Sequence, residues 1–342
     1  MKKNIKSSLI ITTINKPNRN IKRFSLLSKK KNWNLIIIGD HKSPKNFKIN
    51  HGNYLDIIDQ KRLEFKFSKI CPLNSYTRKN IGYLLAIKKK SEIIIETDDD
   101  NYPKNNFFSD KKLKHNVYEI TNKNWINIYD FFINKSEPIW PRGLPLDKIR
   151  DEKIKFSKNK KLLEFYLQQG VCEGNPDVDA IYRLLNPEVN INFKNNKKVS
   201  LGNSYSTFNS QNTTWFKEVF PLMYLPVTCT MRSTDIWRSI IALKIMLLNN
   251  NKILFGGPTM SQFRNKHDLI KDFIDEIPMF ENNKLIFNEI NNLKLKKGKK
   301  NYTKNMKIIY KKLVNMKLFK KNELKYLNAW IYDCEKISSS IY

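Results

Sequence analysis

Three consecutive aspartates, Asp98, Asp99 and Asp100, are the residues with the clearest chemical potential in this sequence. They follow, after Glu96 and Thr97, an apolar run at residues 93–95, whose three isoleucines are typical of a buried strand. Neighbouring carboxylates repel each other and raise each other's pKa, and a divalent cation relieves that repulsion. Oxygen ligands of this kind suit Mg²⁺ or Mn²⁺ shared with substrate phosphates. The pattern favours a metal–diphosphate site at a strand end, with a solvated acidic turn as the alternative.

Strand-like and helix-like segments alternate over about the first hundred residues. Apolar, β-branched stretches at residues 8–14 and 34–38 precede the aspartate-bearing strand, and helical patterns at residues 20–29 and 75–89 separate them. This alternation predicts an α/β fold with a doubly wound, mostly parallel sheet. The sequence has neither a G-x-G-x-x-G motif nor a P-loop, so a nucleotide would have to be held by strand ends and a metal.

Further polar candidates occur in three later segments. Arg142 lies in a proline-rich stretch, residues 138–145, whose restricted backbone would present the cation on a stiff loop. Asp177 and Asp179 belong to the turn GNPDVDA just before a helical pattern, where helix N-capping is an equally good interpretation. Asp235 opens a strongly apolar helical pattern, either as a cap or as part of a second wall of the site.

The composition is extremely basic, with 63 Lys and Arg against 32 Asp and Glu and a formal net charge of +31. This balance favours anionic partners, and an acidic membrane surface stays open among them. The lysines are scattered and no nucleic-acid motif accompanies them, which argues against nucleic acid. The four cysteines are far apart, and no apolar run approaches a membrane span of about 18 residues. We therefore expect a soluble cytoplasmic protein, with peripheral attachment at the inner membrane face as an alternative.

The C-terminal region differs in character from the rest of the chain. From about residue 282 lysine and asparagine dominate, and apolar residues recur with helical spacing. We expect two parts, a catalytic domain over residues 1–281 and a Lys-rich helical appendage over residues 282–342. The appendage would pack on the main domain, mediate homo-oligomer formation, or rest on an acidic surface.

Six stretches, in order along the chain, resemble the STELLO glycosyltransferase-like family. They are ITTINKP (11–17), IIIGDHKSP (36–44), SYTRKNIGYLLAI (75–87), ETDDDN (96–101), WPRGLPL (140–146) and FRNKHDLIKDFIDEIP (263–278). A more distant resemblance to the reversibly glycosylated polypeptides, which are UDP-arabinopyranose mutases, runs through NIGYLLAIKKKSEIIIETDDD, PRGLPL and PDVDA.

The resemblance implies a GT-A nucleotide-diphospho-sugar transferase fold in which the aspartate triad is the DxD motif. Asp98 and Asp100 would then ligate Mn²⁺ or Mg²⁺, and Arg142 matches the arginine that becomes glycosylated in the mutases. The remaining positions expected at the nucleotide and its phosphates are Thr13, Asn15, Asp40, Arg78, Asn80 and Asp99.

The implied function is a metal-dependent glycosyltransferase that uses a nucleotide sugar, with UDP as the expected nucleotide, in surface polysaccharide or other glycan synthesis. The acceptor would be a glycan or a small molecule. Asp177, Asp179 and Asp235 are candidates for a base or for a group that steadies an oxocarbenium-like centre. Two alternatives stay open: a UDP-sugar mutase in which Arg142 carries the sugar, and a non-catalytic scaffold that binds acidic partners through its lysines.

Overall fold

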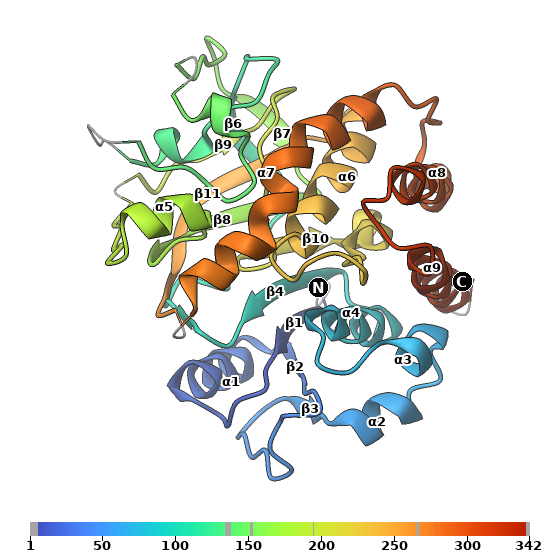
Figure 1. Ribbon diagram of the computed structural model, residues 1–342. Helices are drawn as coiled ribbons and strands as arrows, with labels where there is room; N and C mark the ends of the chain where they lie inside the picture. Colours follow the sequence, from blue (N-terminus) through green and yellow to red (C-terminus); the bar gives the residue numbers. More distant parts are fainter. Residues whose placement is uncertain (1–5, 134–137, 151–152, 194, 265–266, 340–342) are drawn as a thin grey trace.

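A single 11-stranded sheet forms the centre of the protein in this computed structural model, which describes residues 6–133, 138–150, 153–193, 195–264 and 267–339 (Figure 1). The strand order is β3-β2-β1-β4-β10-β8-β11-β9-β6-β7, and β5 pairs with β11. The strands are β1 (Ser7–Thr12), β2 (Asn34–Ile38), β3 (Asn53–Leu55), β4 (Ile93–Asp98), β5 (Asn101–Pro103), β6 (Lys114–Glu119), β7 (Lys161–Glu164), β8 (Leu167–Gly174), β9 (Lys198–Ser200), β10 (Thr213–Phe216) and β11 (Ile253–Gln262).

Helices cover this sheet and account for most of the remaining regular structure. The α-helices are α1 (Arg19–Lys31), α2 (Ile57–Arg62), α3 (Lys66–Ile70), α4 (Lys79–Lys88), α5 (Ala180–Leu185), α6 (Thr234–Leu248), α7 (Leu269–Asn291), α8 (Tyr302–Asn315) and α9 (Glu323–Ser339). Short 3-10 helices are η1 (Tyr76–Arg78), η2 (Ile128–Phe131), η3 (Leu146–Lys148), η4 (Lys217–Met223) and η5 (Lys299–Asn301). None of the described helices is both long and apolar enough to cross a membrane.

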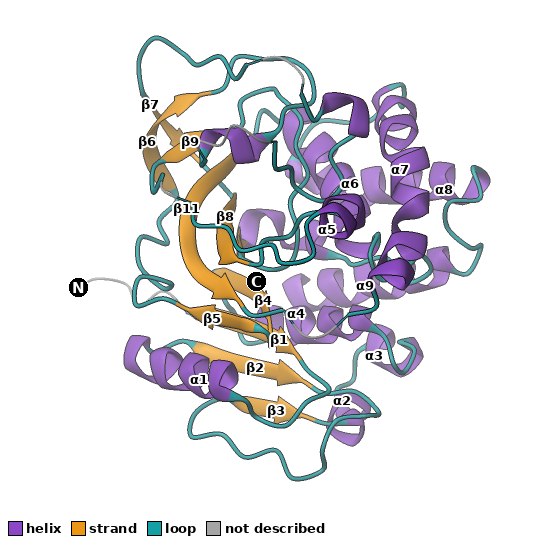
Figure 2. Cartoon of the chain, turned by 60° about the vertical axis from the view of Figure 1, so that its left-hand side comes forward, coloured by secondary structure: helices purple, strands orange, loops and turns teal. Residues whose placement is uncertain are grey.

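The N-terminal part of the sheet is parallel and has helices on both faces. Strand β1 lies between β2 and β4, and β3 follows β2, all in parallel register. Because side chains alternate along a strand, Leu9 and Ile11 join Phe24 of α1 in one apolar cluster, while Ile10 belongs to the cluster on the α4 side. Figure 2 shows α1 and α4 on opposite sides of these strands. Helix α4 approaches closely at Gly82, where a Cβ atom would lie 2.6 Å from Ile10 Cγ2. The predicted α/β class is confirmed.

The two halves of the sheet are joined at β10, which runs antiparallel to both β4 and β8. Glu96 of β4 is fully buried at this junction, where it accepts a 2.7 Å hydrogen bond from Trp215 Nε1 and also binds the hydroxyl of Tyr83. Its counter-ion is Arg238 of α6, at 2.9 Å. This buried ion pair fixes α6 against the strand that carries the three aspartates.

The C-terminal helices pack on the main body and share its core. Trp330 of α9 and Tyr310 of α8 are buried in the same apolar cluster as α4 and α6. Asp333 of α9 accepts hydrogen bonds from the backbone N–H groups of Lys66 (2.9 Å) and Phe67 (2.7 Å), and thereby caps α3. Helix α7 is continuous across residues 281 and 282, where the sequence suggested a boundary. The division into residues 1–281 and 282–342 stays a prediction.

Candidate functional site

A cavity of about 420 Å³ opens at the carboxyl ends of β1 and β4 and reaches the start of α6 and the end of β11. Its walls therefore come from both halves of the sheet, as expected for a ligand site in an open α/β sheet. Every predicted site residue except Asn80 and Asp179 lines it, namely Thr13, Asn15, Asp40, Arg78, Asp98, Asp99, Asp100, Arg142, Asp177 and Asp235.

Asp99, the middle aspartate, ties the end of β4 to the loop that follows β1. Its carboxylate accepts hydrogen bonds from Thr13 Oγ1 at 2.5 Å and Asn15 Nδ2 at 2.9 Å. Its backbone carbonyl accepts two more, from the side chains of Asn18 (2.8 Å) and Asn20 (3.0 Å) at the start of α1. Thr13 and Asn15 thus lie in the cavity wall because they position the acidic turn.

Asp98 is paired with a lysine that the sequence analysis did not single out. Lys79 Nζ lies 2.6 Å from Asp98 Oδ1, and Tyr76 donates to the same oxygen at 3.0 Å. The Lys79 side chain is completely buried, whereas 29% of the Asp98 side chain is exposed. Burial raises the pKa of Asp98 despite the opposing effect of Lys79. One carboxylate of the expected metal pair therefore already has a cation beside it.

Asp100 has an oxygen that lacks a partner. Its Oδ2 accepts a 2.8 Å hydrogen bond from Gln262 Nε2, while its Oδ1 is buried without a hydrogen bond from any described residue. Gln262 Oε1 is a second buried acceptor that receives no hydrogen bond from any described residue. Burial and the neighbouring charge of Asp98 raise the pKa of Asp100 to about 7.

This donor set fits a hard divalent cation, because a cation would satisfy two orphaned oxygen acceptors and offset the crowded carboxylates. No group of three or more His, Cys, Asp or Glu side chains within the described ranges is arranged to hold a metal ion. The protein would thus supply few ligands, and a substrate phosphate or water would have to complete the coordination. Metal binding by Asp98 and Asp100 stays a prediction.

Arg142 lies between the carboxylates of Asp177 and Asp235 in the wall of the cavity, and these three residues are called the ion-pair triad below. It binds Asp177 through Nε (2.8 Å) and Nη2 (2.9 Å), and Asp235 through Nη1 (3.0 Å) and Nη2 (3.1 Å). Nη1 also donates to the carbonyl oxygen of Arg232, so all five guanidinium N–H groups are engaged. Burial alone would raise the pKa of Asp177 and of Asp235, but the charge of Arg142 outweighs this effect and lowers both pKa values. The two carboxylates in turn hold the pKa of Arg142 well above its ordinary value.

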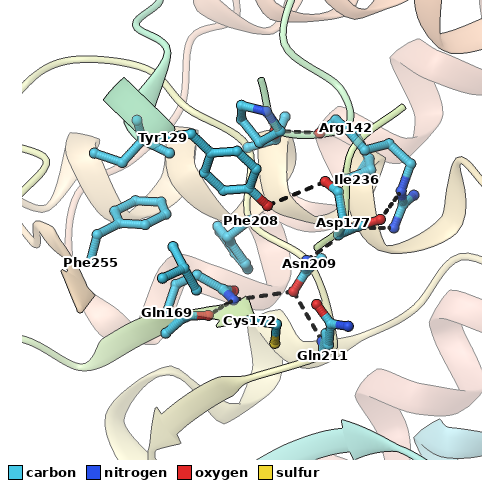
Figure 3. A pocket seen from close by; sticks show the side chains of 15 residues that line it. Tyr129, Arg142, Gln169, Cys172, Asp177, Phe208, Asn209, Gln211, Ile236 and Phe255 are labelled. Atoms are coloured by element: carbon cyan, nitrogen blue, oxygen red, sulfur yellow. Dashed lines mark hydrogen bonds and ion pairs between the residues drawn. The ribbon is translucent and has the colours of Figure 1, made fainter. Parts of the chain in front are cut away.

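A second, much smaller cavity of about 20 Å³ is lined by Arg142 and Asp177, which also line the large cavity (Figure 3). Asn209 donates to Asp177 Oδ2 at 2.8 Å, and the Tyr129 hydroxyl donates to the Asp177 backbone carbonyl at 3.3 Å. Phe208 and Phe255 contribute apolar side chains to its lining. The volume suffices for little more than one water, so a substrate has room only in the larger cavity.

Four predicted residues have structural tasks that their sequence context left undecided. Asp179 is buried outside the cavity, where it caps α5 by accepting from Tyr182 N at 2.8 Å, so the geometry supports the capping interpretation. Asn80 bonds both backbone groups of Leu225. The guanidinium group of Arg78 donates hydrogen bonds to the Gln60 side chain and to the carbonyl oxygens of Cys71 and Pro72. Asp40 orders the loop before η1, because it accepts hydrogen bonds from the backbone N–H groups of Asn74 (2.9 Å) and Ser75 (2.8 Å).

Sequence reasoning missed three residues in or beside the cavity wall, namely Lys79, Gln262 and Arg264. Lys79 and Gln262 contact the aspartates directly, and Arg264 adds a guanidinium group to the wall, as does Arg232. Lys79, Gln262 and Arg264 lie inside or next to the family-like stretches SYTRKNIGYLLAI and FRNKHDLIKDFIDEIP, which was the available signal. Residue type and spacing alone do not distinguish Lys79 and Arg264 from the many exposed cations of this chain.

A mixed α/β sheet with an acidic strand end facing a polar cavity is consistent with a glycosyltransferase fold. Residues 232–341 match the family described as STELLO glycosyltransferases. The chain is also 25% identical over 261 residues to "Probable glycosyltransferase STELLO2" and 24% identical over 261 residues to "Probable glycosyltransferase STELLO1", both from Arabidopsis thaliana. Each alignment covers 69% of this chain and 33% of the relative, so the chain spans about a third of the length of these relatives. The predicted resemblance to the STELLO glycosyltransferase-like family is confirmed.

Proposed function

We propose that the protein is a metal-dependent glycosyltransferase that takes its sugar from a nucleotide donor, with UDP as the nucleotide, and transfers it to a glycan or small acceptor. The observation that carries the proposal is Asp100, which lines the large cavity beside Asp98 and Asp99 and has a buried carboxylate oxygen that accepts no hydrogen bond from a described residue. The match to STELLO glycosyltransferases supports the reaction class. Synthesis of a surface polysaccharide or another glycan is the setting we propose for it.

We assign different parts of the donor to different walls of the cavity. The loops after β1 and β2, with Thr13, Asn15 and Asp40, would contact the nucleoside side, and the end of β4 would face the diphosphate. Mn²⁺ or Mg²⁺ held by Asp100 and Asp98 would offset the negative charge that develops on the departing diphosphate. Lys79 adds a fixed positive charge beneath Asp98.

We assign the sugar of the donor to the part of the cavity beside Arg142, Asp177 and Asp235. Because Arg142 lowers the pKa of Asp177 and Asp235, both carboxylates are ionised at neutral pH and are weak proton acceptors. They are therefore better suited to steady positive charge at the anomeric carbon than to deprotonate an acceptor. Their fixed hydrogen bonds also provide the preorganisation on which electrostatic stabilisation depends.

The bonding of Arg142 favours a transferase over a mutase. A guanidinium that attacks the sugar must free a nitrogen and lose a proton, yet every N–H group of Arg142 is engaged and its pKa is raised. A residue held in this way is a poor nucleophile. We therefore assign Arg142 to positioning and charge balance.

Calorimetric titration with UDP, with and without Mn²⁺, tests the proposal. Asp100→Asn keeps the size of the side chain and removes its charge, and we expect the metal-dependent part of UDP affinity to fall at least about tenfold, or 1.4 kcal/mol. Asp147→Asn is the matched control, because Asp147 is a half-exposed aspartate paired with Lys284. Equal affinities of wild type and Asp100→Asn would refute the metal–diphosphate assignment. A sugar adduct on the intact protein that disappears in Arg142→Lys would instead support the mutase.

A further inference from the structure

Two arginines line one wall of the large cavity, and a third lies behind them. Arg232 precedes α6, Arg264 follows β11, and Arg183 belongs to α5 behind them. Only 11% of the Arg232 side chain and 8% of the Arg264 side chain are exposed, and Arg183 is 2% exposed. Arg264 is two residues from Gln262, which donates a hydrogen bond to Asp100. The arginine cluster therefore lies next to the part of the wall that the three aspartates form.

Carboxylates pair directly with two of these three arginines. Arg264 Nη2 lies 2.5 Å from Asp272 Oδ2, and Arg232 Nε donates to Glu276 Oε1 at 2.7 Å. Arg183 donates instead to Pro176 O at 2.6 Å and to the side chain of Asn175, and no carboxylate of a described residue accepts a hydrogen bond from it. The charges of Asp177 and Glu276 act on Arg183 without such a bond, so Arg183 is a buried cation that lacks a directly bonded carboxylate among the described residues.

The same arginines have unused donors. Arg183 Nε, Arg264 Nε and Arg232 Nη2 are buried and form no hydrogen bond with any residue in the described parts of the chain. Arg232 Nη2 is 2.5 Å from Glu276 Oε1, but without the angle of a hydrogen bond. Burial and the neighbouring charges of Arg264 and Arg232 lower the pKa of Arg183 to about 9. Buried donors without acceptors are uncommon in native proteins and indicate an absent ligand.

We propose that Arg232 and Arg264, supported by Arg183, form a phosphate-binding site in the cavity wall. A phosphate group offers several acceptor oxygens for the donors that lack a hydrogen bond among the described residues, and the planar fork of arginine matches its geometry. This proposal rests on the function proposed above, because the reaction determines where the phosphate comes from. The phosphate belongs either to the diphosphate of the donor or to a phosphorylated acceptor.

Inorganic phosphate is the probe for the site. Titration of the metal-free protein should show phosphate binding that Arg264→Gln and Arg232→Gln each weaken at least tenfold. Arg264→Lys keeps the charge and loses the fork, so we expect an intermediate affinity. Arg62→Gln, which changes an arginine whose side chain is 77% exposed, is the matched control. Thermal melting of each variant shows whether it is folded before its affinity is interpreted.

Two further arms separate the sources of the phosphate. If the site takes the donor's diphosphate, UDP with Mg²⁺ displaces phosphate and Arg264→Gln weakens UDP binding; if it takes an acceptor, phosphate also binds the UDP complex. Asp100→Asn should retain phosphate binding in either case, so a failure of the metal assignment is distinguishable from a failure of this site. Absence of phosphate binding, or equal affinities of wild type and both folded glutamine variants, would overturn the proposal.

Discussion

Replacing Arg142 with glutamine tests whether this residue acts by charge balance in the core of the site. The variant keeps a polar side chain of moderate length but removes the cation shared by Asp177 and Asp235. The structure predicts two consequences, a large loss of stability at neutral pH and a reversal of how stability depends on pH. The second consequence is the more informative, because a simple packing defect would not produce it.

The magnitude follows from what the two carboxylates would lose. Removing one partner of a buried ion pair costs about 3 to 5 kcal/mol, because an uncompensated charge stays behind. Arg142 serves two carboxylates, but Asn209 still donates to Asp177 at 2.8 Å, and the backbone N–H and hydroxyl of Ser210 still donate to Asp235 at 3.1 Å. We therefore expect a loss near the upper end of that range, about 5 kcal/mol at pH 7.

The sign of the pH dependence differs between the two proteins. In the wild type the pKa of Asp177 and that of Asp235 are lowered, so their contribution is present above the unfolded-state pKa and is lost as pH falls through the folded-state pKa. In the variant, burial without Arg142 should raise both pKa values. Protonation then relieves the penalty, and stability should increase as pH falls from about 7 to 5.

Urea unfolding followed by circular dichroism at pH 7 and pH 5 measures both effects. Arg62→Gln serves as the control for loss of an arginine at an exposed position. A variant with wild-type stability at both pH values, but without transferase activity, would refute the structural role. Arg142 would then have to act directly on the substrate.

Two further predictions concern buried charges outside the triad. Arg238→Met leaves Glu96 without its counter-ion in the core and should lower the free energy of unfolding in urea by about 3 to 5 kcal/mol. The double variant with Glu96→Gln should lose less stability than the sum of the two single variants. An additive result would contradict the pairing. Burial raises the pKa of Asp179 to about 6, so wild-type stability should fall as pH rises from about 4 to 6, by about 2 kcal/mol from this group. Asp179→Asn retains an N-capping side chain and should lack this slope; the same slope in the variant would show that another group causes it.

The parts of the site that could be predicted from sequence depend on local patterns. A short isoleucine run followed by aspartates indicates a strand end, and the carboxyl ends of neighbouring parallel strands meet at one edge of a sheet. Asp98, Asp99 and Asp100 therefore come together with Thr13 and Asn15 in the cavity wall without any long-range information. The alternation of strands and helices predicted the fold class for the same reason.

The parts that could not be predicted depend on packing between distant segments. Arg142, Asp177 and Asp235 were each named as candidates, but the ion pairs between them join three segments whose contact no local pattern encodes. Lys79 begins a helix in a chain with many surface lysines, so its complete burial beside Asp98 depends on the packing of α4 on β1 and β2. Arg264 was hidden for a similar reason, since a cation in a polar segment resembles a solvated residue.

The cap that α9 places on α3 sets an order for the assembly of the nascent chain. Asp333 follows Phe67 by 266 residues, so the ribosome must synthesise that length before the contact can form. At about 5 to 20 residues per second this interval lasts roughly 13 to 50 seconds. Throughout it, the faces of α3 and α4 that α9 covers in the folded protein lack that helix.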